Sequence, residues 1–404
     1  MTKHKKTLRK VIALLLAFIM VGSIIPTMAF AATTEAEAKE DIEEHVSFIQ
    51  SIVIEIRNFI QKVTDFVKKL FKLGDKEPEV ISVEEIKIDK TEIKLIIGES
   101  DKIAVTVAPD NATDKGYTIV SSDEAVATVD AEGNITAIAR GTATITVTAN
   151  ADATKQATVE VNVFDEVITT AWENFNDTYR GKDGSYILGN DFNPGNVIFF
   201  GNATTVTLDL NDKTVEAGNP GQYIFGSQNG SSLRLTGDGT VYAGKGVMTN
   251  KLGAEIIFDG GTYYFTQTGT LNDMKHCSVA QNDSKIVIND GKFFTDVEDA
   301  CLFFATTNSI IEINGGFFEN TADKTPDLLS MGTNKYTTQR IILKGGTFVN
   351  YNPLEDRMCY TGEKPYEQLG GPWMVVWEGN TVVAEEQENG DIWYSVVPES
   401  AVNA

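Results

Sequence analysis

The chain has 404 residues, of which 57 are acidic and 34 are basic, so its formal charge is −23 at pH 7. This acidic excess argues against nucleic acid as a partner, because phosphate backbones are bound by clustered lysine and arginine. With 3 cysteines and 3 histidines, the chain has neither a disulfide framework nor typical metal-ligand spacing, so neither a metal nor a cofactor is expected.

Residues 1–31 have the pattern of a secretory signal peptide. Basic residues from Lys3 to Lys10 precede an apolar run from Val11 to Ile25, and the small-residue site Ala29-Phe30-Ala31 follows. The apolar run is shorter than the roughly 20 residues that span a bilayer, so cleavage is favoured over the alternative of an uncleaved anchor helix. We therefore expect a secreted or surface-exposed protein.

Residues 32–74 are predicted to form one amphipathic helix. Apolar residues recur at a spacing of four and three, which is typical of a coiled-coil seam, and they are Ile42, Val46, Ile49, Val53, Ile56, Ile60, Val63, Val67 and Leu70. The expected contact face comprises Ile49, Ile56, Phe59, Ile60 and Phe66. Three roles remain open: self-association through 35–73, packing on the protein's own body, and peripheral contact with a membrane surface. The β-branched seam favours trimers or larger assemblies if the helix self-associates.

A polar linker is expected at 75–82, followed by short alternating strands over 83–164 that are typical of a β-sandwich. This segment resembles the bacterial group 2 immunoglobulin-like domain. The stretches that carry the resemblance are Ile97-Gly98-Glu99-Ser100, Val105-Thr106-Val107-Ala108-Pro109, Val126-Ala127-Thr128-Val129-Asp130 and Gly141-Thr142-Ala143-Thr144-Ile145-Thr146-Val147. The resemblance implies an extracellular spacer or adhesive unit of a bacterium, without catalytic residues.

Residues 165–350 contain an internal repeat of alternating apolar residues, a turn, and an aromatic or β-branched residue. The copies are TLDLNDKTV (207–215), LRLTGDGTV (233–241), IIFDGGTY (256–263), IVINDGKFF (286–294), IEINGGFF (311–318) and IILKGGTF (341–348). They resemble the right-handed parallel β-helix of the pectate-lyase-like superfamily. This fold hosts lyases, hydrolases, fibres and adhesins, so the resemblance does not select a function. The expected fold class is therefore mainly β, an Ig-like sandwich followed by a β-helix.

Alternation along the repeats assigns side chains to the inside and the outside of the β-helix. One inward column is expected to hold Leu210, Leu235, Phe258, Ile288, Ile313 and Leu343, and another Val215, Val241, Tyr263, Phe293, Phe318 and Phe348. Tyr242, Tyr264 and Phe294 come one residue after the second column and should point outward as an aromatic strip. Such a strip suits sugar rings or a protein surface. The alternative is that a long loop, such as 266–285, covers it.

Enzymes with the fold that the sequence resembles use converging acidic residues. The acidic residues of this segment are instead scattered over its turns. The tightest acidic cluster is Asp296, Glu298 and Asp299, and Asp296 and Asp299 with calcium are the first candidates if the protein is a lyase. His276 and Cys301 should occupy equivalent positions on neighbouring coils. That pair alone would make a poor metal site, so no catalytic residue is assigned.

Residues 351–404 are predicted to be a C-terminal cap and tail, in which Trp373, Trp377 and Trp393 are expected to form cap core rather than a ligand platform. The sequence as a whole favours a non-catalytic adhesion or glycan-binding protein whose partner is a polysaccharide or a cell-surface glycoprotein. The alternatives are a β-helix polysaccharide lyase or hydrolase with a non-standard site, and a purely structural surface or fibre protein.

Overall fold

The computed structural model describes residues 35–71, 79–169, 181–195, 197–217, 221–271, 274–332, 338–359 and 372–402. The chain divides into two compact units, residues 1–80 and 81–404. The expected signal peptide at 1–31 lies outside the described residues, as does the first half of the expected linker at 75–82.

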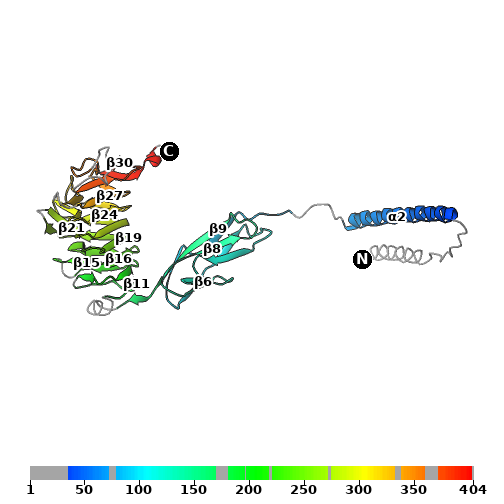
Figure 1. Cartoon of the computed structure of the whole chain (residues 1–404), viewed down its shortest axis with the longest axis horizontal. Helices are drawn as coiled ribbons and strands as arrows, with labels where there is room; N and C mark the ends of the chain where they lie inside the picture. The colour runs from blue at the N-terminus through cyan, green and yellow to red at the C-terminus, as the bar shows by residue number, and fades with distance from the viewer. Residues whose placement is uncertain are drawn as a thin grey trace. The chain divides into compact units, whose positions relative to one another are not determined.

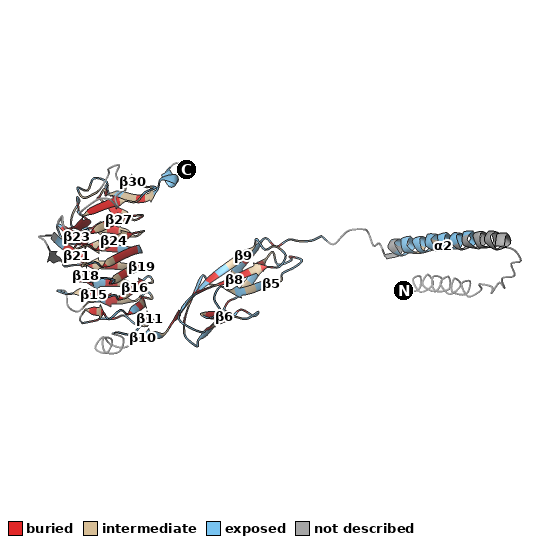
Figure 2. Cartoon of the chain, in the orientation of Figure 1, coloured by how far each residue is buried: buried red, intermediate tan, exposed pale blue. Residues whose placement is uncertain are grey.

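The first unit contains one long helix, α2 (Glu35–Phe71), drawn in blue in Figure 1. The helix lies within the predicted range 32–74. Several large apolar side chains on it are exposed, and Figure 2 colours most of the described part of the helix pale blue. Among the described residues, no helix is both long enough and apolar enough to cross a bilayer.

The second unit begins with an Ig-like β-sandwich. Its strands are β1 (Glu85–Ile88), β2 (Glu92–Ile96), β3 (Ser100–Lys102), β4 (Val105–Ala108), β5 (Tyr117–Ser121), β6 (Ala127–Val129), β7 (Asn134–Ala137), β8 (Gly141–Ala149) and β9 (Gln156–Phe164). One sheet has the order β2-β9-β8-β5 and another β3-β7-β6, while β1 pairs with β4. Alternate residues of β8 and β9, such as Ile145 and Val161, are fully buried between the sheets.

The sandwich leads directly into a parallel β-solenoid. β10 (Glu166–Ile168) starts two residues after β9 ends and pairs in parallel with β11 (Gly184–Leu188). Lys94 of the sandwich forms an ion pair with Asp209 of the solenoid at 3.0 Å, and Arg140 donates to the backbone carbonyl of Asp183 at 3.2 Å. Asp209 is almost completely buried.

Each solenoid coil contributes strands to three faces that stack in parallel (Figure 1). The first face contains β11, β13 (Thr205–Asp209), β16 (Ser232–Thr236), the first halves of β19 (Glu255–Phe265) and β22 (Lys285–Thr295), β24 (Ile310–Ile313), β27 (Arg340–Leu343) and β29 (Trp373–Val376). The second face contains β14 (Thr214–Glu216), β17 (Thr240–Ala243), the second halves of β19 and β22, β25 (Phe317–Asn320) and β28 (Thr347–Val349). The third face contains β12 (Ile198–Phe200), β15 (Tyr223–Gln228), β18 (Lys245–Asn250), β20 (Gly269–Leu271), β21 (Met274–Gln281), β23 (Ala300–Ala305) and β26 (Leu329–Met331).

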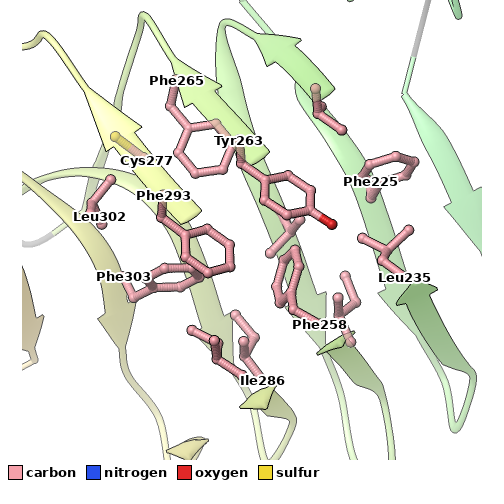
Figure 3. Packing of buried hydrophobic residues seen from close by; sticks show 14 of the residues in the cluster. Phe225, Leu235, Phe258, Tyr263, Phe265, Cys277, Ile286, Phe293, Leu302 and Phe303 are labelled. Atoms are coloured by element: carbon pink, nitrogen blue, oxygen red, sulfur yellow. The ribbon is translucent and has the colours of Figure 1, made fainter. Parts of the chain in front are cut away.

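The core of the solenoid is a set of apolar ladders (Figures 2 and 3). Every residue of the two predicted inward columns is fully buried. The predicted first column is wrong in one place, since Leu208 rather than Leu210 lies opposite Leu235. The turn after β13 contains one residue more than the turn after β16, and Asn211 and Asp212 in it have positive φ. Leu210 is buried under this longer turn.

The end of the solenoid combines parallel and antiparallel pairing. β29 adds another parallel strand beside β27, so the parallel stacking extends beyond residue 350. β31 (Ile392–Pro398) pairs antiparallel with both β28 and β30 (Asn380–Glu386), and the short helix α4 (Glu399–Val402) follows. Trp373 is buried at 4% exposure, as expected for cap core, whereas Trp393 is 37% exposed.

Candidate functional site

The second face of the solenoid places Tyr242, Tyr264 and Phe294 side by side on its outer surface. Tyr242 lies opposite Tyr264, and Tyr264 lies opposite Phe294, in the parallel registers of β17, β19 and β22. The residues before them, such as Tyr263 and Phe293, are fully buried, and strand alternation therefore turns these three outward. Tyr242 is 45% exposed, and the other two are half-buried.

These rings form a continuous stack. The centroids of Tyr242 and Tyr264 are 5.0 Å apart with planes inclined by 10°, and those of Tyr264 and Phe294 are 5.0 Å apart and inclined by 15°. The row continues to Phe317 at 5.9 Å, and then to Trp393, which packs edge-on at 5.2 Å. We call these five residues the aromatic strip.

Sequence reasoning missed the last two members of the strip. Phe317 lies one column away, opposite Lys292 rather than Phe294. Trp393 comes from β31, which joins this face by antiparallel pairing. The alternating pattern of the repeat contains no signal for that pairing.

The loop that was considered as a cover for the strip belongs to another face. Within residues 266–285, β20 and β21 pair with each other and add to the third face beside β18 and β23. Residues 272 and 273 lie outside the described residues.

The stacking restricts how the strip could contact a ligand. Rings that stack in parallel cover each other's faces, so Tyr264 and Phe294 present mainly their edges outward. Tyr242 is the end of the stack, with only one neighbour, Tyr264, among the described rings. Its other face is directed toward the adjacent strand β14, where the exposed Glu216 occupies the equivalent position.

Polar side chains flank the strip on the same face. Thr214, Thr240 and Thr262 align in a neighbouring outward column, and the exposed Lys292 continues that column. Glu319 lies opposite Phe294, and burial raises its pKa above the ordinary value. Tyr242 thus has the carboxylate of Glu216 and threonine hydroxyls at neighbouring strand positions.

The described acidic residues of the solenoid do not converge on one site. Asp296, Glu298 and Asp299 are all exposed, with Lys275 as the nearest base at 3.9 Å from Asp299. Turn acids elsewhere have partners of their own, and Asp259, for example, pairs with Arg234 and accepts a hydrogen bond from Asn289. Among the described residues, no group of three His, Cys, Asp or Glu side chains could hold a metal ion.

His276 and Cys301 occupy equivalent positions on β21 and β23, as the repeat predicted. Both are buried, and the hydroxyl of Tyr223 lies 2.8 Å from Nε2 of His276. Burial raises the pKa of the Cys301 thiol well above its ordinary value and that of Tyr223 to about 12. A neutral thiol in an apolar site is a poor nucleophile, which favours a structural role for this cluster.

The residues expected to form the contact face of the helix lie along α2. Ile60 is 58% exposed and Phe66 is 41% exposed, whereas Ile56 and Phe59 are half-buried. The side chain of Ile49 lies outside the described residues. The role of this face stays a prediction.

Residues 82–161 match the family model of the bacterial Ig-like domain (group 2). The chain therefore contains a bacterial Ig-like domain followed by a parallel β-solenoid. An uncharacterized protein of Clostridium acetobutylicum is 48% identical over 61 residues, which are 15% of this chain and 6% of that protein. A 3-O-alpha-D-galactosyl-alpha-L-arabinofuranosidase of Bifidobacterium longum subsp. longum is 42% identical over 72 residues, covering 18% of this chain and 6% of the enzyme. A solved structure of domains 4 and 5 of the S-layer protein SbsC is 25% identical, covers 20% of this chain and 51% of that chain, and has a TM-score of 0.18. The chain thus spans only a small part of these two relatives.

Proposed function

We propose that this protein is a bacterial secreted or cell-surface protein that binds a glycan or a surface glycoprotein without transforming it. In this proposal the Ig-like domain is a spacer and the solenoid presents the binding face. Bacterial Ig-like domains of group 2 are typical of surface proteins, and the chain contains one over residues 82–161. The signal-peptide pattern at residues 1–31 is consistent with export.

One observation carries the proposal: Tyr242, at the end of the aromatic strip, is 45% exposed, contacts a single ring among the described residues, and has polar groups at neighbouring strand positions. Sugar rings have apolar C–H faces that pack on aromatic rings, while their hydroxyls need hydrogen-bond partners. Tyr242 supplies the ring face, and Glu216 can accept hydrogen bonds from sugar hydroxyls. Thr240 lies two residues before Tyr242 on the same outer face and adds a hydroxyl.

The partial likeness to the arabinofuranosidase of Bifidobacterium longum supports a setting in which glycans are present. The likeness covers 18% of this chain, so it does not extend the enzyme's activity to this protein. The exposed, dispersed acids of the solenoid likewise favour binding over hydrolysis, since acid–base cleavage of a glycosidic bond needs two carboxyl groups held roughly 5 to 10 Å apart across the bond.

The test is a glycan array probed with the wild-type protein and with Tyr242→Ala. We expect a defined set of glycans to bind and the substitution to weaken binding by at least about tenfold, which corresponds to about 1.4 kcal/mol. Tyr242→Phe should retain most of the affinity, because it keeps the ring face.

Leu252→Ala is the matched control. Leu252 is 78% exposed and lies in the turn before β19, at another corner of the coil, so its removal should leave glycan binding unchanged. Equal binding by wild type and Tyr242→Ala would contradict the proposed site. Release of unsaturated or reducing-end products from a bound glycan by the wild type would replace the proposal with the lyase or hydrolase alternative.

A further inference from the structure

Helix α2 presents apolar side chains that the rest of its own unit leaves exposed. Ile60 is 58% exposed, Val53 48%, Phe66 41% and Val67 37%, and all four lie on the predicted seam or the expected contact face. A helix gains most of its stability in a protein by burying such a face, and exposed apolar stripes of this kind mark contact surfaces.

The charges on the helix are segregated along its length. Between residues 35 and 53 the sequence has six acidic residues and one lysine, and between residues 54 and 71 it has four basic and two acidic residues. The helix macrodipole favours this arrangement within one copy. The same distribution of charge makes the helix electrostatically complementary to a second copy that runs in the opposite direction.

We propose that α2 pairs with α2 of a second copy of this chain in an antiparallel orientation. The preference of a β-branched seam for trimers or larger assemblies applies to parallel helices and does not select against an antiparallel pair. A parallel pair would bring the two acidic ends together, and like charges at that separation repel each other. An antiparallel pair places each acidic end beside a basic end. The proposal is independent of the glycan site on the solenoid.

The seam spacing is compatible with this orientation. When two such helices run in opposite directions with position 53 of one beside position 56 of the other, position 60 lies level with position 49, and both are seam positions. In that register the acidic positions 40 and 41 lie level with the basic positions 69 and 68, on the outer sides of the pair and not at the seam. One register therefore aligns the apolar seam and places the acidic half of each helix beside the basic half of the other.

The same charges disfavour a membrane surface as the occupant of this face. Basic residues near one end could contact anionic headgroups, but the acidic residues of the first turns would be repelled by them. A second copy offers an oppositely charged partner to both ends of the helix, whereas an anionic membrane attracts only the basic end.

The experiment measures the distance between spin labels in the exported full chain, whose N-terminus is first read by mass spectrometry. The label is attached to Ala38→Cys in a Cys359→Ser background, because Cys277 and Cys301 are buried. In the antiparallel pair, position 38 of each copy lies level with position 71 of the other, which separates the labels by roughly 50 Å at ~1.5 Å per residue. A parallel pair would give less than about 20 Å, one helix diameter plus the label linkers.

A peak near 50 Å supports the proposal, and a short distance overturns the orientation. Sedimentation of the chain as a monomer overturns the pairing itself. Binding of the chain to anionic vesicles without self-association in solution overturns it as well. Ile60→Asp, on the seam, should raise the dissociation constant of the pair at least about tenfold, and Asn58→Asp, an exposed position off the seam, should change it less than about threefold. Added salt should weaken an antiparallel pair and strengthen a parallel one, because it screens attraction in the first and repulsion in the second.

Discussion

Tyr263 places a polar hydroxyl group in the apolar core of the solenoid. The residue is fully buried, and its hydroxyl has no hydrogen-bond partner among the described residues. Figure 3 shows it among the hydrocarbon side chains of Phe225, Leu235 and Phe258. Burial raises the pKa of Tyr263 far above its ordinary value, because an anion could not be stabilised there.

We predict that Tyr263→Phe stabilises the solenoid. A buried hydroxyl without a partner costs about 1 to 3 kcal/mol. Removing it leaves a void of roughly 10 Å³, which costs about 0.2 kcal/mol at ~24 cal/mol per Å³. The ring keeps its stacking on Phe293 at 5.0 Å and its edge contact with Phe258 at 5.0 Å. The free energy of unfolding should therefore rise by about 1 to 3 kcal/mol.

The assay is denaturant unfolding followed by tryptophan fluorescence. None of the four tryptophans lies in the Ig-like domain: Trp373, Trp377 and Trp393 lie in the last coil and cap, and Trp172 lies in the sequence between β10 and β11, outside the described residues. The signal therefore reports on the part of the chain that follows the Ig-like domain. Phe293→Tyr is the matched control, since it adds a hydroxyl one coil away in the same buried column and should lower stability by about 1 to 3 kcal/mol. If Tyr263→Phe left the unfolding free energy unchanged or lowered it, the hydroxyl would have a stabilising partner and the reasoning would be refuted.

Three further predictions concern the junction, the cap and a turn. Lys94→Ala should lower the free energy of unfolding by about 1 to 3 kcal/mol, because it leaves the buried carboxylate of Asp209 without its ion-pair partner. Asp209→Asn in the same chain should recover part of the loss, which a double-mutant cycle measured by calorimetry would show. Lys324 holds the pKa of Asp391 below its ordinary value through a hydrogen bond of 2.7 Å. The folded pKa is lower than the unfolded one, so this contribution is present above about pH 4 and is lost as the pH falls through the folded pKa; Asp391→Asn should flatten that part of an acid titration monitored by fluorescence. Gly345→Ala should destabilise the solenoid by about 1 to 3 kcal/mol, because a Cβ there would collide with a backbone carbonyl of the preceding coil; an unchanged melting temperature would contradict this packing.

The repeat made the architecture and most of the core predictable, because stacked coils reuse the same alternation. The turns of the later coils have equal length, so aligning them by sequence places Tyr264 beside Phe294 and Phe258 beside Ile288. The alignment failed at Leu210 because the first turn is longer. A pattern of alternating residues defines which way a side chain points, but it does not contain the length of an individual turn.

The parts of the candidate site that sequence reasoning missed depend on contacts between distant segments. Trp393 reaches the strip only through the antiparallel pairing of β31 with β28, and Tyr223 reaches His276 across an intervening strand. Neither contact repeats from coil to coil. Both contacts depend on how segments distant in the sequence pack together, which a local pattern cannot predict.

The geometry of the strip also determines which substitution can test binding. Each stacked pair contributes about 0.5 to 1.5 kcal/mol to the cohesion of neighbouring coils, and Tyr264 takes part in two such pairs. Tyr264→Ala would therefore weaken the solenoid as well as any ligand contact, and a loss of binding would have two explanations. Tyr242 takes part in one pair and has the more exposed ring, so its removal disturbs the stack least. A loss of glycan binding by Tyr242→Ala with an unchanged unfolding transition would locate the ligand at that ring.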